Sequence, residues 1–98
     1  MAKFLLLWEL DPTKVPISPQ ERGTAWSRLL DMVEQDLKKG ALKDWGGFVG
    51  EINGYAVAEG TEVEIGNLVQ QYIPFVCFKV HPIASWSQVN EVTKALSK

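Results

Sequence analysis

The sequence has few of the residues that build covalent or metal-based sites. It contains one cysteine, Cys77, and one histidine, His81. A single cysteine excludes an internal disulfide bond and a metal clip of two thiolates, and a single histidine makes a dedicated zinc or haem-iron site unfavourable. We therefore expect no metal and no cofactor, and a reducing, cytoplasmic setting.

The chain also lacks an excess of charge of one sign and a long hydrophobic run. Ten basic and twelve acidic residues give a net charge of −2, and no Walker loop or dinucleotide glycine fingerprint is present. The apolar run at residues 4–8 is followed at once by Glu9, whereas a signal peptide needs about 7–15 apolar residues and a membrane span about 20. We expect neither nucleic-acid binding nor membrane insertion.

The pair Asn53-Gly54 is the strongest hairpin signal in the chain. Both central residues of a type I′ turn need positive φ, which Asn and Gly adopt at least cost, so the pair predicts two antiparallel strands joined there. The strand before the turn contains Gly46, Gly47 and Gly50, which indicates an edge position, a bulge or the close approach of another backbone.

Three amphipathic helices are predicted from their start and stop signals. Each begins with a hydroxyl residue followed three positions later by Glu or Gln, the pattern of a capping box: Ser18 and Glu21, Thr61 and Glu64, Ser85 and Gln88. Pro19 and Gly40 bound the first helix, and Pro74 prevents the second from continuing.

The strands predicted near the two ends of the chain are apolar on both faces. They cover residues 3–10 and 75–80, and His81-Pro82 is expected to close the second of them. Strands of this kind are covered on both sides, yet one layer of helices covers only one face of a sheet. The C-terminal helix can cover part of the other face and a second copy all of it, and we favour the homodimer.

This order of elements predicts one α+β domain over residues 1–98. A β-α-β-β-α-β order with an added C-terminal helix is the ferredoxin-like arrangement, with a four-stranded antiparallel sheet. Right-handed crossovers place the first and third strands in its centre.

The chain resembles the dimeric α+β barrel superfamily over roughly residues 3–96. The resemblance rests on the opening FLLLW, the glycine-rich strand before GYAVAE, the capped helix TEVE and the closing FKVHP. The chain is most similar to a group of small uncharacterised domains there, and more distantly to muconolactone isomerase and the YCII-like proteins. Members include small isomerases, cofactor-free monooxygenases, haem-degrading enzymes and proteins with no known activity. The resemblance implies a homodimer with a pocket between sheet and helices, and no particular substrate.

Three polar residues on apolar strands are candidates for chemistry. His81 and Glu9 are candidate catalytic bases, and Lys79 beside them is a candidate for holding an anionic group of a ligand. The alternatives are a strand-end histidine in water and a Glu9–Lys79 ion pair that only fixes the register of a dimer.

Aromatic residues supply the remaining candidates for ligand binding. Trp8, Trp45 and Tyr55, together with Phe48, are predicted to wall a pocket, although aromatic side chains in small domains more often form core or interface. Cys77 has no activating neighbour in the sequence and is predicted to lie in the core.

Two functions remain open from the sequence. The first is a homodimeric small-molecule domain, with or without catalysis. The second is a non-catalytic interaction or dimerisation module. A pocket of about 300 Å³ or more with convergent polar groups would favour the first, and the absence of a cavity would favour the second.

Overall fold

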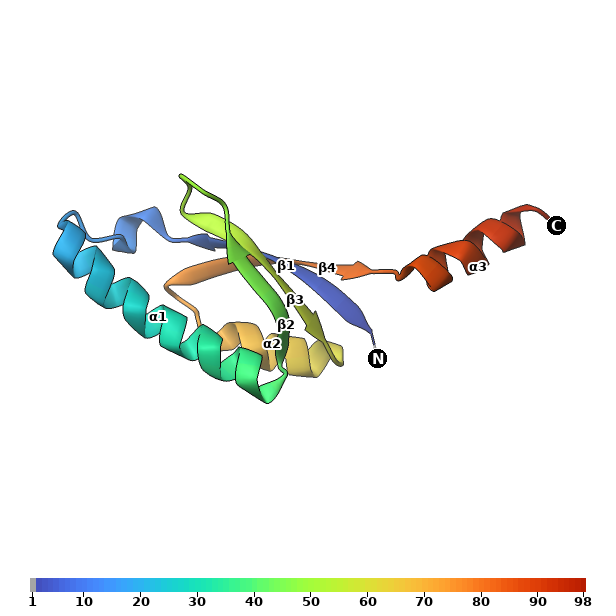
Figure 1. Cartoon of the computed structure of the whole chain (residues 1–98), viewed down its shortest axis with the longest axis horizontal. Helices are drawn as coiled ribbons and strands as arrows, with labels where there is room; N and C mark the ends of the chain where they lie inside the picture. Colours follow the sequence, from blue (N-terminus) through green and yellow to red (C-terminus); the bar gives the residue numbers. More distant parts are fainter. Residues whose placement is uncertain (1) are drawn as a thin grey trace.

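The computed structural model describes residues 2–98, in which a four-stranded antiparallel sheet is combined with three α-helices (Figure 1). In chain order the elements are β1 (Lys3–Leu10), a 3₁₀ turn (Pro12–Lys14), α1 (Pro19–Lys39), β2 (Leu42–Gly47), β3 (Asn53–Glu59), α2 (Glu62–Gln70), β4 (Val76–Ile83) and α3 (Trp86–Leu96). The strands lie in the order β2-β3-β1-β4. The α+β class, the antiparallel sheet and the central position of the first and third strands are confirmed.

The helix boundaries follow the capping signals of the sequence. Complete capping boxes start α2 at Thr61 and α3 at Ser85. At α1 the Ser18 hydroxyl accepts a hydrogen bond from the Glu21 N–H at 3.4 Å. The second bond of a capping box, from the Ser18 N–H to the Glu21 carboxylate, is not formed in the described residues, so this box is incomplete. Gly40 ends α1, as predicted, and its φ of 78° is the left-handed conformation that glycine commonly adopts after a helix.

The glycine-rich strand β2 lies at an edge of the sheet, as predicted. A register shift between Leu42 and Asp44 places a bulge near its start, before the glycines and so not at the positions from which a bulge was expected. The other edge is β4, so both edges of the sheet are open.

The hairpin turn, however, is not at Asn53-Gly54, and this prediction is wrong. The turn is made by residues 48–51, where the Glu51 N–H donates to the Phe48 carbonyl oxygen at 3.1 Å. Its third residue, Gly50, has φ of 82° and supplies the left-handed conformation. Asn53 and Gly54 already belong to β3.

The reason for glycine at position 54 is the close approach of another side chain. A Cβ atom there would lie 2.6 Å from the indole of Trp8 and would clash with the Gly46 carbonyl oxygen. Gly54 is paired with Trp8 in β1 and with Gly47 in β2, so the Trp8 ring lies on a surface of two glycines. The same residue type that favours a turn is here required for packing.

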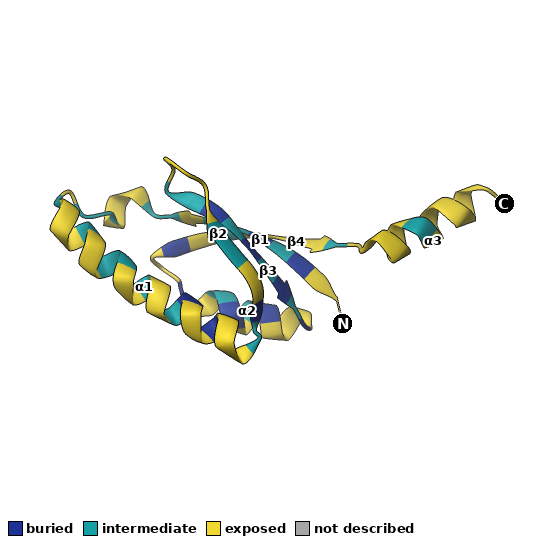
Figure 2. Cartoon of the chain, in the orientation of Figure 1, coloured by how far each residue is buried: buried dark blue, intermediate teal, exposed yellow. Residues whose placement is uncertain are grey.

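The core lies between one face of the sheet and the helices α1 and α2 (Figures 1 and 2). Its buried members include Phe4, Leu6, Ala56, Ala58 and Leu68. The opposite face of the sheet carries Leu5, Leu7, Tyr55 and Val57, which are only half-buried. We call this second surface the open sheet face.

Strand β4 runs further than expected, and Cys77 is not a core residue. His81 and Pro82 lie inside β4, opposite Leu5 and Phe4 of β1, and the strand ends at Ile83. A proline is tolerated because β4 is an edge strand, where one backbone side has no partner. Cys77 is exposed on the open sheet face, since the helices cover only the other face.

Helix α3 extends away from the sheet (Figure 1). None of its residues is buried, and the chain measures 60 × 26 × 19 Å as a result. Its radius of gyration is 16.2 Å, against about 13 Å for a compact chain of this length. Helix α3 therefore does not cover the open sheet face of its own chain.

We expect the exchange Gly54→Ala to lower the free energy of unfolding by about 3 kcal/mol or more, because the new methyl group forces the Trp8 indole and a backbone carbonyl apart. Gly66→Ala in α2 is the matched control, since nothing lies within 4 Å of its added Cβ and alanine favours a helix. It should raise stability by about 0.5–1 kcal/mol. Urea unfolding measures both, and equal stability of the two variants would contradict this role of Gly54.

Candidate functional site

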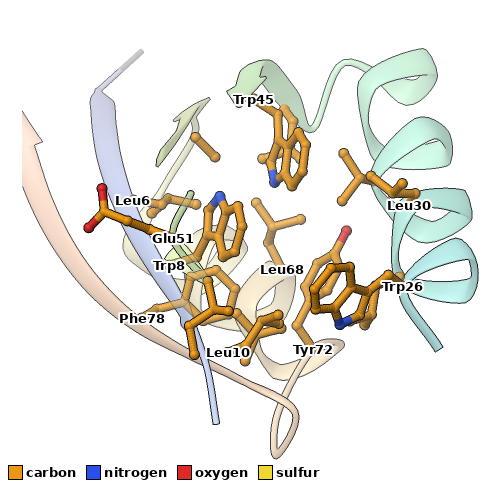
Figure 3. Close-up of a pocket in the computed structure, with 16 residues that line it drawn as sticks. Leu6, Trp8, Leu10, Trp26, Leu30, Trp45, Glu51, Leu68, Tyr72 and Phe78 are labelled. Carbon is orange, nitrogen blue, oxygen red and sulfur yellow. The ribbon is translucent and has the colours of Figure 1, made fainter. Parts of the chain in front are cut away.

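A cavity of about 190 Å³ lies between the sheet and helices α1 and α2 (Figure 3). Its walls are almost entirely apolar, and five aromatic rings contribute to them: Trp8, Trp26, Trp45, Tyr72 and Phe78. Leucine, isoleucine, valine and alanine side chains from the sheet, from α1 and from α2 complete the lining.

The two indoles on the sheet side form a stacked pair. The ring centroids of Trp8 and Trp45 are 5.2 Å apart and the ring planes differ by 3°. The Trp8 N–H donates to the carbonyl oxygens of Gly46 and Tyr55, each at 3.2 Å. These bonds hold the Trp8 ring against Gly47 and Gly54, where it forms one wall of the cavity.

Helices α1 and α2 line the other side of the cavity, which stays partly open to solvent next to Leu30. The apolar stripe of α1 presents Trp26, Leu30 and Val33 to the cavity, and α2 adds Leu68. Trp26 is a lining residue that was not among the candidate site residues predicted from the sequence. Its position one turn before Leu30 on the apolar face was the available signal.

A buried tyrosine–aspartate pair ties the ends of the two helices together. The Tyr72 hydroxyl donates to Asp36 Oδ2 at 2.5 Å, and Asp36 is only 2% exposed. Burial, and then the hydrogen bond to Asp36, raise the pKa of Tyr72 well above its ordinary value. Because this hydroxyl already donates its proton to Asp36, it is not free to donate a hydrogen bond to a ligand in the cavity. Nothing in the sequence pattern paired these two residues, which lie 36 positions apart.

Charged groups are scarce at the cavity. Among its lining residues only Glu51 carries a charge, and this side chain belongs to the exposed turn between β2 and β3. Its carboxylate points away from the centre of the cavity (Figure 3). The interior therefore offers apolar contacts and aromatic faces.

The predicted aromatic residues divide between the two faces of the sheet. Trp8 and Trp45 line the cavity. Tyr55 lies on the open sheet face, where its ring stacks on Phe48 with centroids 6.4 Å apart. The Tyr55 hydroxyl donates to Asp44 Oδ2 at 2.9 Å, and this bond raises the pKa of Tyr55. The four rings do not form one pocket wall.

The predicted polar residues all lie on the open sheet face and do not converge. Glu9 is opposite Cys77, Lys79 is opposite Leu7, and His81 is opposite Leu5. The expected Glu9–Lys79 pair is thus displaced by two residues, and the described residues form no ion pair there. Glu9 and His81 are separated by about 13 Å along the strands. In residues 2–98 no cluster of His, Cys, Asp and Glu is arranged to hold a metal ion.

Replacing Tyr72 by Phe should lower the free energy of unfolding by about 1–3 kcal/mol, because it leaves the Asp36 carboxylate buried without its donor. Tyr55→Phe removes the same kind of bond at the surface and should cost much less. Wild-type stability should also fall as the pH rises above 10.0, because the unfolded chain then releases a proton that folded Tyr72 keeps. Chemical unfolding across pH measures both effects, and equal losses in the two variants would contradict the buried pair.

Comparisons with known proteins add no assignment. No protein-family model matches the chain, and the curated proteins contain no match to it. None of the helices in residues 2–98 is long and apolar enough to cross a membrane. The cavity and the open sheet face are therefore the features of the structure that bear on function.

Proposed function

We propose that the protein is a homodimeric α+β domain that binds a small apolar molecule in the cavity between its sheet and helices. The observation that carries this proposal is the cavity itself, about 190 Å³ of space beside the stacked indoles of Trp8 and Trp45. An apolar protein cavity of about 150 Å³ stays dry and binds benzene or xenon. The space is therefore sufficient for a ligand with a ring.

The lining limits the ligand to a neutral molecule of about one ring or two fused rings. The cavity is smaller than the roughly 300 Å³ at which pockets for drug-sized ligands begin. A charged ligand would lose its hydration without gaining a charged partner inside the cavity, because the lining is almost entirely apolar and the Glu51 carboxylate points away from its centre. The exposed indole face of Trp45 favours a planar ring at stacking distance.

The proposal is one of binding, without a claim of turnover. The candidate bases His81 and Glu9 and the candidate anion partner Lys79 lie on the open sheet face, and the sheet separates them from the cavity. A general base must come within hydrogen-bond reach of the proton that it removes. None of these three residues has that reach into the cavity.

The proposal includes the ferredoxin-like arrangement and the pairing of two sheets into an α+β barrel. It is supported by the strand order β2-β3-β1-β4 and by α1 and α2 packing on one face. It is also supported by the half-buried Leu5, Leu7 and Val57 on the open sheet face. Apolar side chains on an uncovered face favour the packing of a second copy.

A non-catalytic interaction module is the second candidate function. The exposed apolar side chains outside the cavity favour it, because large patches of this kind mark contact with another protein. A module of this kind needs no occupant between the sheet and the helices. Occupation of the cavity by a small molecule therefore separates the two functions.

Replacing Leu30 by Trp should close the cavity and abolish binding of benzene, used as a probe. Leu30 lines the cavity and is 49% exposed, so a larger ring has room to turn inward without displacing the core. In the wild type, benzene should shift the NMR signals of the Trp26 and Trp45 indole N–H groups. In the variant the shifts should vanish or need at least about tenfold more benzene, which is about 1.4 kcal/mol of binding free energy.

Leu37→Trp is the matched control for this experiment. Leu37 lies on the same helix and is 40% exposed, but it does not line the cavity. His81→Ala tests the opposite face of the sheet. Both variants should bind benzene as the wild type does. Benzene without effect on the wild-type indole signals, or equal binding by the two tryptophan variants, would refute the proposed function.

A further inference from the structure

Helix α3 carries an apolar stripe that is not covered by any other element in residues 2–98. Trp86 is 80% exposed, Val89 52%, Val92 62% and Leu96 82%. The opposite side of the helix carries Ser87, Glu91 and Lys94. The helix has 11 residues, and isolated helices below about 12–15 residues are marginal in water. The stripe therefore needs a surface on which to pack.

The open sheet face is the other uncovered apolar surface of the same chain. Leu7 and Tyr55 are direct cross-strand neighbours on it, and β4 adds Lys79 opposite Leu7 and the exposed Cys77 opposite Glu9. Strand β4 runs through residues 84–85 directly into α3, which points away from its own sheet (Figure 1). The apolar stripe of α3 and the open sheet face are thus both uncovered, and they do not contact each other within one chain.

We infer that α3 is an exchanged arm, whose stripe packs on the open sheet face of a second copy of this chain. In a dimer whose two-fold axis lies near the end of β4, the two sheets would overlap only over the ends that contain Leu5 and Ile83. Each α3 would then extend over the start of the partner's β4, next to Cys77 and Lys79.

The area of the arms agrees with the size of a stable dimer interface. The four side chains of the stripe present roughly 500 Å² of apolar surface, given about 150–250 Å² for a large aromatic ring and less for the others. With the surface that receives them, two arms bury about 2,000 Å² in all, the upper end of a standard interface.

Other contacts of the same surfaces are less favourable. The exposed edge of β4 carries Lys79 and Pro82, which oppose the addition of a further strand. The polar side of α3 mixes Glu91 with Lys94, whereas helices that lie on membranes are rich in basic residues. An α3–α3 pair would span fewer than the three or four heptads that mark a coiled coil.

The inference rests on the proposed homodimer, and the double variant Val89→Asp/Leu96→Asp tests it in the full chain. Two carboxylates in the stripe should convert the dimer to a monomer, as measured by light scattering on a sizing column. The matched control is Ser87→Asp/Ala95→Asp, which adds the same charges to the other side of α3 and should remain a dimer. The benzene-binding cavity lies on the opposite face of the sheet, so both variants should still bind the probe.

Cross-linking identifies the surface that receives the arm. Wild-type chain, whose only thiol is Cys77, is mixed with the variant Cys77→Ser/Val92→Cys and treated with a short bis-maleimide. A covalent dimer that forms only in the mixture supports the exchange. Cys77→Ser/Ala95→Cys, with its thiol on the other side of α3, should give much less covalent dimer.

Four results would overturn the inference. A covalent dimer of Cys77→Ser/Val92→Cys alone would show that the arms pair with each other. An internal cross-link in Val92→Cys at monomer mass would show that α3 folds back on its own sheet. A wild-type dimer that survives the stripe variant and gives no cross-link in the mixture would leave the homodimer standing without the exchange. A wild-type monomer at every concentration would refute the homodimer and the exchange together.

Discussion

The packing of the Trp8 indole against two paired glycines is the interaction on which the rest of the structure depends. Gly54 and Gly47 let the ring lie flat on the sheet, and its N–H bridges the carbonyl oxygens of Gly46 and Tyr55. The edge strand β2 is thereby held to the sheet by a side chain of β1. Because the ring lies flat, Trp45 stacks on it and space remains beneath α1.

The sheet separates two chemically different surfaces. The helix-covered face carries an aromatic cavity, where the Trp8 N–H and the Tyr72 hydroxyl are already engaged in hydrogen bonds. The open sheet face carries Glu9, Lys79 and His81 among half-buried leucine and valine side chains. The proposed binding of an apolar molecule uses the first surface, and the proposed association with a second copy uses the second.

Local signals in the sequence predicted the fold well, and long-range contacts account for what they missed. Capping residues, helix stripes and doubly apolar strands act over a few positions, so the elements and the central strands could be predicted. The sequence pattern at Asn53-Gly54 indicates a turn, whereas the structure requires Gly54 for its close contact with Trp8, because both situations call for glycine. The Tyr72–Asp36 hydrogen bond depends on the packing of segments that are distant in the sequence. Trp8 and Tyr55 lie on opposite faces of the sheet because of the register between β1 and β3. Cys77 was placed in the core because its strand reads as apolar, although no helix covers that face.

The central claim is that a dry cavity with the size of a ring lies beside the stacked indoles of Trp8 and Trp45. A crystal structure of the wild-type protein under xenon pressure tests it most directly, because xenon enters apolar cavities and scatters strongly. The account predicts a xenon atom between the indole pair and Leu30, with the surrounding side chains unmoved. A structure in which Trp26 or Leu30 fills this space, and xenon does not enter, would contradict the account.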